Sequence, residues 1–418
     1  MFAQKQTSSN NNFLEALVPQ SLIASIRDLS NIQTTNEGLC PIKIDLELGR
    51  IREITSIEKT SQSNMPLLLP RLIEPHAHID KAFTWKDFPN LSGTYQGAMK
   101  ANLEEHKDRT KKKVRTRANR SLQLALQNGV RAMRSHVDSV GEIGDKSWEV
   151  LLEIKDEWKP LIELQLVALV PLDYWLTSEG KDLARKVADE GGLLGGVIVP
   201  PYKNRQLRNL LFNFLALANN LGCAIDLHID ESDMQPACGI CELLDVLDQV
   251  KIDVPITCSH LSSLGFLPNQ TLERVAQRIA NQKISVIALP LTNFWLLSRY
   301  ERKTPTKRPL APISQLQNAG VTVAIGGDNV QDPWNPIGDF DPIALMGASL
   351  PIAQIAPWER LGLATYTTGA SQIMNLEWDG RFQIGSPADF VLLKADSWSG
   401  AMANPPERKI MIQGNWIE

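Results

Sequence analysis

Short apolar runs alternate with helical stretches along most of the chain, from about residue 70 onward. The stretches at 111–129, 204–222 and 271–282 carry apolar residues at helical spacing, and the first two end at a glycine. Strands that alternate with helices indicate parallel β-α units whose strands are buried on both faces. The strand-like runs lie at 70–78, 130–137, 161–169, 195–200, 223–229, 254–259, 284–290 and 321–326. Eight such units favour a closed (β/α)8 TIM-like barrel, in the α/β class, over an open sheet.

The two ends of the chain have a different pattern. Residues 1–69 hold broken strand-like alternation with turn residues, and residues 377–418 alternate in a similar way. We therefore expect a small β-sandwich domain built from 1–69 and 377–418, and a barrel domain at 70–376. Two or three helices between about 340 and 376 are expected to close off the barrel.

Composition and charge narrow the classes of partner. The net charge of −4 over 418 residues is close to neutral, and the lysines at 111–113 lie in a mixed-charge helical stretch, so we expect a solvated surface there and no nucleic-acid binding. Residues 1–13 lack the apolar core of a signal peptide. The most apolar later run, 285–297, contains Pro290, Thr292 and Asn293 and is too short to span a bilayer. The protein is therefore expected to be cytoplasmic, without a membrane partner.

Histidines gather at the ends of the expected strands, and a barrel of parallel strands carries its chemistry at their C-terminal ends. Five of the six histidines and one aspartate fall there: His76, His78, His136, His228, His260 and Asp328. A single histidine such as His136 serves equally well as a capping or packing group, but five at one end of a barrel indicate a site. The sixth, His106, lies in a charged helical stretch and is expected at the surface.

His76 and His78 give the sharpest local signal. Strand side chains alternate between faces, so residues two apart point the same way and both imidazoles can share one cation. His228 and Asp328 arrive from the fifth and eighth strands, which makes three imidazoles and a carboxylate. Imidazole suits Zn²⁺ or Fe²⁺, and such a set leaves room for a water molecule, whose pKa a metal lowers to near neutrality. We predict a site for one divalent metal ion.

Several ordered segments carry a resemblance to a known family. These are "EPHAHIDK", "RSHVD", "ELQLVA", "DLHIDESD", "CSH", "DNVQDPWNPIG" and the tail "GSPADFVLL". The chain resembles the metal-dependent amidohydrolase superfamily, and within it the bacterial cytosine deaminase group, from about residue 65 to the C-terminus. The resemblance implies a hydrolase of pyrimidine metabolism that converts a small N-heterocycle, cytosine above all, into its oxo form and ammonia. It also implies assembly into a homo-oligomer.

The same resemblance implies roles for the reacting residues. The metal set would hold iron or zinc. Glu231 would pass a proton to the ring nitrogen, and His260 would orient or polarise the attacking oxygen. Asp328 would take the proton from the attacking water. Two carboxylates in different environments allow one site to perform both acid and base steps.

Three further residues are expected to contact the substrate. Gln165 in "ELQLVA" offers an amide donor and acceptor, which match a ring carbonyl beside a ring N–H. Trp334 would border the substrate or serve only as a packed core residue. Asn329 stands where the cytosine deaminase group has a second acid, so it bears on the exocyclic amino group and on substrate preference.

Other interpretations remain open from the sequence. Glu231 favours ring deamination, whereas "HIDK" is closer to the enzymes that act on triazines, so an N-isopropylammelide-type triazine, isocytosine or creatinine are alternative substrates. Cys238 and Cys241 faintly resemble the C-x-x-C of zinc deaminases, but the spacing to the histidine differs and a structural helix start is expected. A second metal would need a bridging lysine after the fourth strand, where the chain instead has Pro200 and, beyond it, Lys203. A barrel that only binds a ligand is a third alternative.

Overall fold

The computed structural model describes residues 13–24, 33–58, 64–202, 204–299, 302–404 and 406–417. Contacts within the chain divide it into two compact units. One unit holds Glu74–Leu124 and Ala132–Phe340, and the other holds the described parts of Met1–Ile73, Ala125–Arg131 and Asp341–Glu418. The expected boundaries at 70 and 376 stay a prediction.

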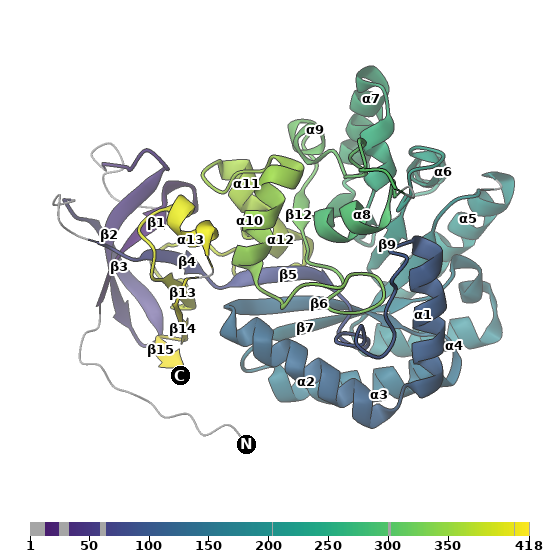
Figure 1. The fold of residues 1–418 in the computed structure, drawn as a ribbon, viewed down its shortest axis with the longest axis horizontal. Coiled ribbons are helices and arrows are strands. Elements are labelled where there is room, and N and C mark those ends of the chain that lie inside the picture. The colour runs from purple at the N-terminus through teal and green to yellow at the C-terminus, as the bar shows by residue number, and fades with distance from the viewer. Residues whose placement is uncertain are drawn as a thin grey trace. The chain divides into compact units, whose positions relative to one another are not determined.

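The eight expected strand runs form one eight-stranded parallel sheet, in the order of the chain (Figure 1). The strands are β5 (Leu72–Ala77), β6 (Val130–Asp138), β7 (Glu163–Leu169), β8 (Leu193–Ile198), β9 (Ile225–Ile229), β10 (Ile256–His260), β11 (Ser285–Ala288) and β12 (Val323–Ile325). The backbone N–H of Asp328, just after β12, donates to the carbonyl of His76 in β5 at 2.9 Å, and Ala77 and Asp328 form a parallel bridge. The first and last strands therefore meet, and the expected barrel is confirmed.

Helices between the strands follow the apolar spacing of the sequence. They are α1 (Tyr95–Asp108), α2 (Lys111–Gln127), α3 (Gly141–Trp158), α4 (Ser178–Asp189), α5 (Asn204–Leu221), α6 (Cys238–Leu247), α7 (Asn269–Asn281), α8 (Pro290–Leu296) and α9 (Ile313–Asn318). The inward stripe of α2 is fully buried at Val114, Ala118 and Leu122. The helix stops before Gly129, whose φ of +82° is the left-handed conformation that ends many helices.

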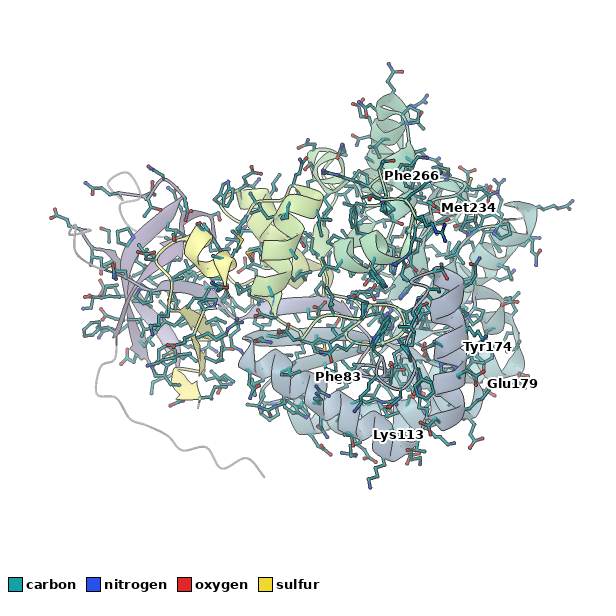
Figure 2. All side chains as sticks on the ribbon, in the orientation of Figure 1. Phe83, Lys113, Tyr174, Glu179, Met234 and Phe266 are labelled. Atoms are coloured by element: carbon teal, nitrogen blue, oxygen red, sulfur yellow. The ribbon has the colours of Figure 1, made fainter. Side chains whose placement is uncertain are left out.

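The opposite face of α2 carries the lysine cluster. Lys111 pairs with Glu149 and Lys113 pairs with Asp108, and all four side chains are exposed. Figure 2 shows Lys113 pointing outward at the edge of the molecule. The expected solvated surface is confirmed. Among the described residues, none of the helices combines the length and apolar character that crossing a bilayer requires.

A seven-stranded, mostly antiparallel sheet joins both ends of the chain, as expected. Its strands are β1 (Phe13–Pro19), β2 (Leu39–Glu47), β3 (Arg50–Ser56), β4 (Leu67–Pro70), β13 (Phe390–Leu393), β14 (Arg408–Ile412) and β15 (Asn415–Ile417). Purple N-terminal and yellow C-terminal strands lie side by side in Figure 1, where β4 pairs with β13. The same unit contains α10 (Pro342–Ala353), α11 (Arg360–Ala364), α12 (Thr368–Ile373) and α13 (Trp398–Ala403). The first three are the helices expected between 340 and 376.

Candidate active site

A cavity of about 630 Å³ lies at the C-terminal ends of the barrel strands. Five of its lining residues belong to the site expected from the sequence: His78, His228, Glu231, His260 and Asp328. Asn329 and Trp334, from the segment after β12, line it too. Seven of the residues proposed from the sequence are thus brought to one cavity.

The four expected metal ligands converge. The Nε2 atoms of His76 and His78 lie 3.5 and 3.1 Å from Asp328 Oδ1. One ring nitrogen each of His76, His78 and His228 lie within 4.8 Å of one another. Because these residues come from β5, β9 and the end of β12, the barrel itself brings the ligand set together.

The protonation of this set suits a divalent cation. Burial, reinforced by the neighbouring histidines, lowers the pKa of His76 and of His228 well below the usual value, so both imidazoles are neutral. Burial alone would raise the pKa of Asp328, but His78 and His260 lower it, so this carboxyl is ionised. Among the described residues, His76 Nε2, both ring nitrogens of His228 and both carboxylate oxygens of Asp328 are buried without a hydrogen-bond partner. Neutral imidazoles and a free carboxylate fit a metal ion.

A chain of hydrogen bonds orients His76. Its Nδ1 lies 2.9 Å from Ser259 Oγ, and that hydroxyl donates to Asp226 Oδ1 at 2.7 Å. Since the single hydroxyl hydrogen of Ser259 goes to Asp226, the oxygen accepts from His76 Nδ1–H, which leaves the Nε2 lone pair for a cation. Arg134 Nη1 holds the other oxygen of Asp226 at 2.8 Å.

Glu74 fixes the backbone beside the expected ligands His76 and Asp328. Its carboxylate accepts the backbone N–H of His76 at 3.1 Å and that of Gly327 at 3.0 Å, so it joins the backbone beside two ligands. A Cβ at Gly327 would come within 2.8 Å of Glu74 Oε2, so glycine permits this approach. Burial raises the pKa of Glu74 to about 8.

Glu231 and His260 form a pair next to the metal set. Glu231 Oε1 lies 3.4 Å from His260 Nδ1, and Asn293 of α8 points its Nδ2 at both atoms, at 3.2 and 2.9 Å. An amide N–H can only donate, so His260 Nδ1 accepts and its proton sits on Nε2. Burial, and secondarily Asp328, raises the pKa of Glu231 well above its usual value, so the carboxyl holds a proton.

Two of the functional residues have left-handed backbone. His260 has a φ of +75° and Asp328 a φ of +63°, a region that non-glycine residues rarely adopt. Each such residue costs on the order of 1–3 kcal/mol and persists because surrounding structure holds it. Both lie where a strand ends, and the turn of the backbone there aims their side chains at the cavity.

Of the three residues expected to contact the substrate, Asn329 and Trp334 line the cavity and Gln165 does not. Asn329 donates from Nδ2 to Asp332 Oδ2 at 2.7 Å, so its Oδ1 and second amide hydrogen are what it can offer the cavity. Trp334 both lines the cavity and packs, with its ring 4.9 Å from that of Tyr95. Gln165 is placed elsewhere, because its Oε1 accepts from Arg134 at 3.1–3.2 Å and it is not among the residues that line this cavity. Its expected contact with the substrate stays a prediction.

His106 is not a simple surface residue, contrary to expectation. It lines the cavity, its side chain is 22% exposed, and its Nε2 lies 3.0 Å from Asp138 Oδ2. Asp138 also accepts from Lys81 at 3.0 Å and from Arg109 at 3.1 Å. Burial alone would raise the pKa of Asp138, but Lys81, His106 and Arg109 hold it well below its usual value. The expectation was wrong because it rested on the charge of α1 and not on which face of α1 meets the barrel.

Four residues were named in the sequence analysis without a definite role in the site. His136 is fully buried on β6, with its ring stacked 3.9 Å from that of His76. Cys238 begins α6, as expected of a structural helix start, and both Cys238 and Cys241 are free thiols. Lys203 lies outside the described residues.

Reasoning from sequence missed Glu74, Asp226, Ser259 and Asn293. Glu74, Asp226 and Ser259 lie inside quoted motifs but were given no role there, and Asn293 lies in the apolar run at 285–297. A polar residue within an apolar run is the signal that could have found them.

Comparisons with known proteins agree with this geometry. The model of the "Amidohydrolase family" matches residues 200–409. The chain is 30% identical to a pterin deaminase of Rhizobium rhizogenes (strain K84 / ATCC BAA-868) over 388 residues, 91% of this chain and 88% of the relative. It is 24% identical to the N-isopropylammelide isopropyl amidohydrolase of Pseudomonas sp. (strain ADP), over 84% of this chain and 85% of that one.

A solved structure shares the fold. The 5-methylcytosine deaminase of Klebsiella pneumoniae liganded with 5-fluorocytosine superposes with a TM-score of 0.81 at 22% identity, over 97% of both chains. Both the family model and the relative with 30% identity cover at least half of this chain. The barrel, its ligand set and these matches lead to one conclusion: the chain belongs to the amidohydrolase family.

Proposed function

We propose that the protein hydrolytically deaminates a small N-heterocycle with the help of one divalent metal ion, iron or zinc. The observation that carries the proposal is the buried set of His76, His78, His228 and Asp328, each with at least one polar atom that has no hydrogen-bond partner among the described residues. The set lies beside the protonated Glu231, in a cavity of ligand size. A metal held there would activate water and polarise the ring carbon.

The chain's own groups account for the proton transfers. Water adds to the ring carbon that bears the amino group, and Asp328 accepts one of its protons. Glu231 gives its proton to the neighbouring ring nitrogen, so the carbon becomes tetrahedral. His260, with its proton on Nε2, donates a hydrogen bond to the developing oxygen. Asp328 then gives the proton that it took from water to the amino group, which leaves as ammonia. The added hydroxyl passes its proton to Glu231, so the ring keeps a C=O and an N–H and both carboxyl groups return to their starting states.

The candidate substrates come from the resemblance and from the relatives. Cytosine is the leading substrate implied by the resemblance. Pterin, the compound in the name of the 30% identical relative, is the larger alternative. An N-alkylated triazine is a further one. Asn329 supports any of them, since its fixed amide can hydrogen-bond the exocyclic amino group.

Ammonia release from a panel of heterocycles tests the proposal. Purified protein loaded with Fe²⁺ or Zn²⁺ is assayed with cytosine, pterin, isocytosine, creatinine and N-isopropylammelide, and alkylamine release is followed for the last. Turnover of any ring supports the proposal and names the substrate. Stoichiometric metal without turnover of any compound would leave a ligand-binding barrel as the better account.

A further inference from the structure

One face of α1 forms part of the cavity wall. Its lining residues recur at helical spacing, which places them on one side of the helix. They are Tyr95, Met99, Asn102, Leu103 and His106. Met99 and Leu103 are apolar and yet 40% and 51% exposed, and Val140, which lines the same cavity after β6, is 48% exposed. Apolar side chains gathered at a cavity typically contact an apolar part of a ligand.

Lys81 and Asn102 supply the polar groups of this wall. Lys81 is 4% exposed and gives one ammonium hydrogen to Asp138 Oδ1, so two hydrogens remain for another acceptor. Asn102 is 5% exposed and its Nδ2 lies 3.4 Å from Asp138 Oδ2. Its Oδ1 is buried and has no hydrogen-bond partner within the described part of the chain. A buried carbonyl oxygen of this kind calls for a donor.

These two groups are neighbours because they contact the same carboxylate. A donor on Lys81 beside an acceptor on Asn102 matches a ring carbonyl next to a ring N–H. Neither residue belongs to the metal set, and neither takes part in the proton transfers. Their chemistry is therefore available for recognition of the substrate away from the reacting carbon.

We propose that α1 and the Lys81–Asp138 pair form a specificity subsite for a second, fused ring of the substrate. The carbonyl and N–H edge of the heterocycle meets Lys81 and Asn102, and the flat faces of the second ring contact Met99 and Leu103. Asp138 is a positioning residue, since it acts by holding Lys81. The inference rests on the proposed function, because it assigns the reacting ring to the metal end. A single six-membered ring fills only part of about 630 Å³, so a two-ring substrate is preferred.

Two variants and a control test the subsite. Asn102→Leu keeps the shape of the side chain and removes the acceptor. Met99→Trp narrows the subsite without touching a polar group. Lys100→Ala changes an exposed residue of the same helix that does not line this cavity and serves as control. The measurement is kcat/KM for the two-ring and the one-ring compounds of the panel above, with metal content determined for each variant.

The ratio of the two kcat/KM values decides the outcome. We expect it to fall by about tenfold or more in Asn102→Leu and in Met99→Trp, mainly through KM of the two-ring compound, and to stay within about twofold in Lys100→Ala. An unchanged ratio in both α1 variants, at full metal content, overturns the subsite.

A second measurement distinguishes failure of the proposed deamination from failure of the proposed subsite. If the wild type deaminates no compound, calorimetry measures binding of the two-ring compound to the metal-loaded protein. Binding about tenfold weaker in both α1 variants than in Lys100→Ala still supports the subsite. Equal binding in all variants, or no binding to the wild type, overturns it.

Discussion

Two aspartates line the same cavity, Asp138 half-buried and Asp328 fully buried, and their surroundings are opposite. Asp138 ends β6 and accepts hydrogen bonds from Lys81, His106 and Arg109, of which the cations Lys81 and Arg109 neutralise it. Asp328 follows β12 and accepts no hydrogen bond from a lysine or arginine of the described residues; its neighbours include the imidazoles of His76 and His78. A buried carboxylate without such a cation is costly unless something else supplies positive charge. The contrast indicates a structural role for Asp138, whose charge the protein balances. It supports the proposed role of Asp328 as a metal ligand.

The largest expected effect comes from removing the free carboxylate. Asp328→Asn replaces a charged ligand and proton acceptor with a neutral amide, so we expect deamination to fall by about 10⁴-fold or more. Metal per chain, measured by atomic absorption, should fall with it. The metal-free variant should be at least as stable as the metal-free wild type, because it no longer buries a negative charge that no lysine or arginine balances. Wild-type metal content together with wild-type turnover would remove Asp328 from the ligand set.

Glu231→Gln separates the proton donor from the metal set. Glutamine has nearly the same shape but no acidic proton, so turnover should fall by about 10²–10⁴-fold. Metal content should match the wild type, since Glu231 is not expected to be a ligand. Substantial activity in this variant, measured as ammonia release, would rule out the proton-transfer role.

For Asp138, whose charge is balanced by protein cations, we expect the opposite effect on stability from that of Asp328. Asp138→Asn leaves the buried Lys81 and Arg109 short of negative charge, so we expect the free energy of unfolding of the metal-free protein to fall by about 3–5 kcal/mol. Urea unfolding gives the value. The control is Glu104→Gln, which breaks the exposed pair with Lys107 and should cost about 0–1 kcal/mol. Equal effects of the two substitutions would mean that the Asp138 cluster adds no stability.

The smallest expected effect concerns the orientation of His76. Ser259→Ala removes the acceptor for His76 Nδ1–H, which should weaken metal affinity by about 10–100-fold. Competition with a chelator measures the affinity directly. Activity should return when excess metal is supplied, because Ser259 contacts neither substrate nor the reacting atoms. Activity that stays low at saturating metal would contradict a purely positioning role.

The barrel and the convergence of the four expected ligands could be predicted from sequence for a physical reason. Strand periodicity places His76 and His78 on one face, and parallel strands bring their C-terminal ends together, so local pattern and topology agree. Asn293 could not be found this way, since its role exists only where α8 approaches Glu231 and His260. Gln165 was chosen because its amide chemistry fits a substrate, and nothing in the sequence indicated that Arg134 of the neighbouring strand donates to its Oε1. The sequence pattern of one strand does not predict which side chains of other strands will contact it.

The closure of the barrel between β5 and β12, here called the seam, affects how the protein folds during synthesis. Glu74 and Gly327, which are joined by a hydrogen bond, stand 253 residues apart along the chain, and the imidazoles of β5 meet Asp328 at the same seam. During synthesis the first two histidines leave the ribosome long before their carboxylate does. A nascent chain therefore has no complete ligand set until β12 has emerged and docked. If the set holds a cation, as the proposed function requires, binding of that cation can follow only the emergence of β12, and a chain truncated before Asp328 lacks one of the four expected ligands.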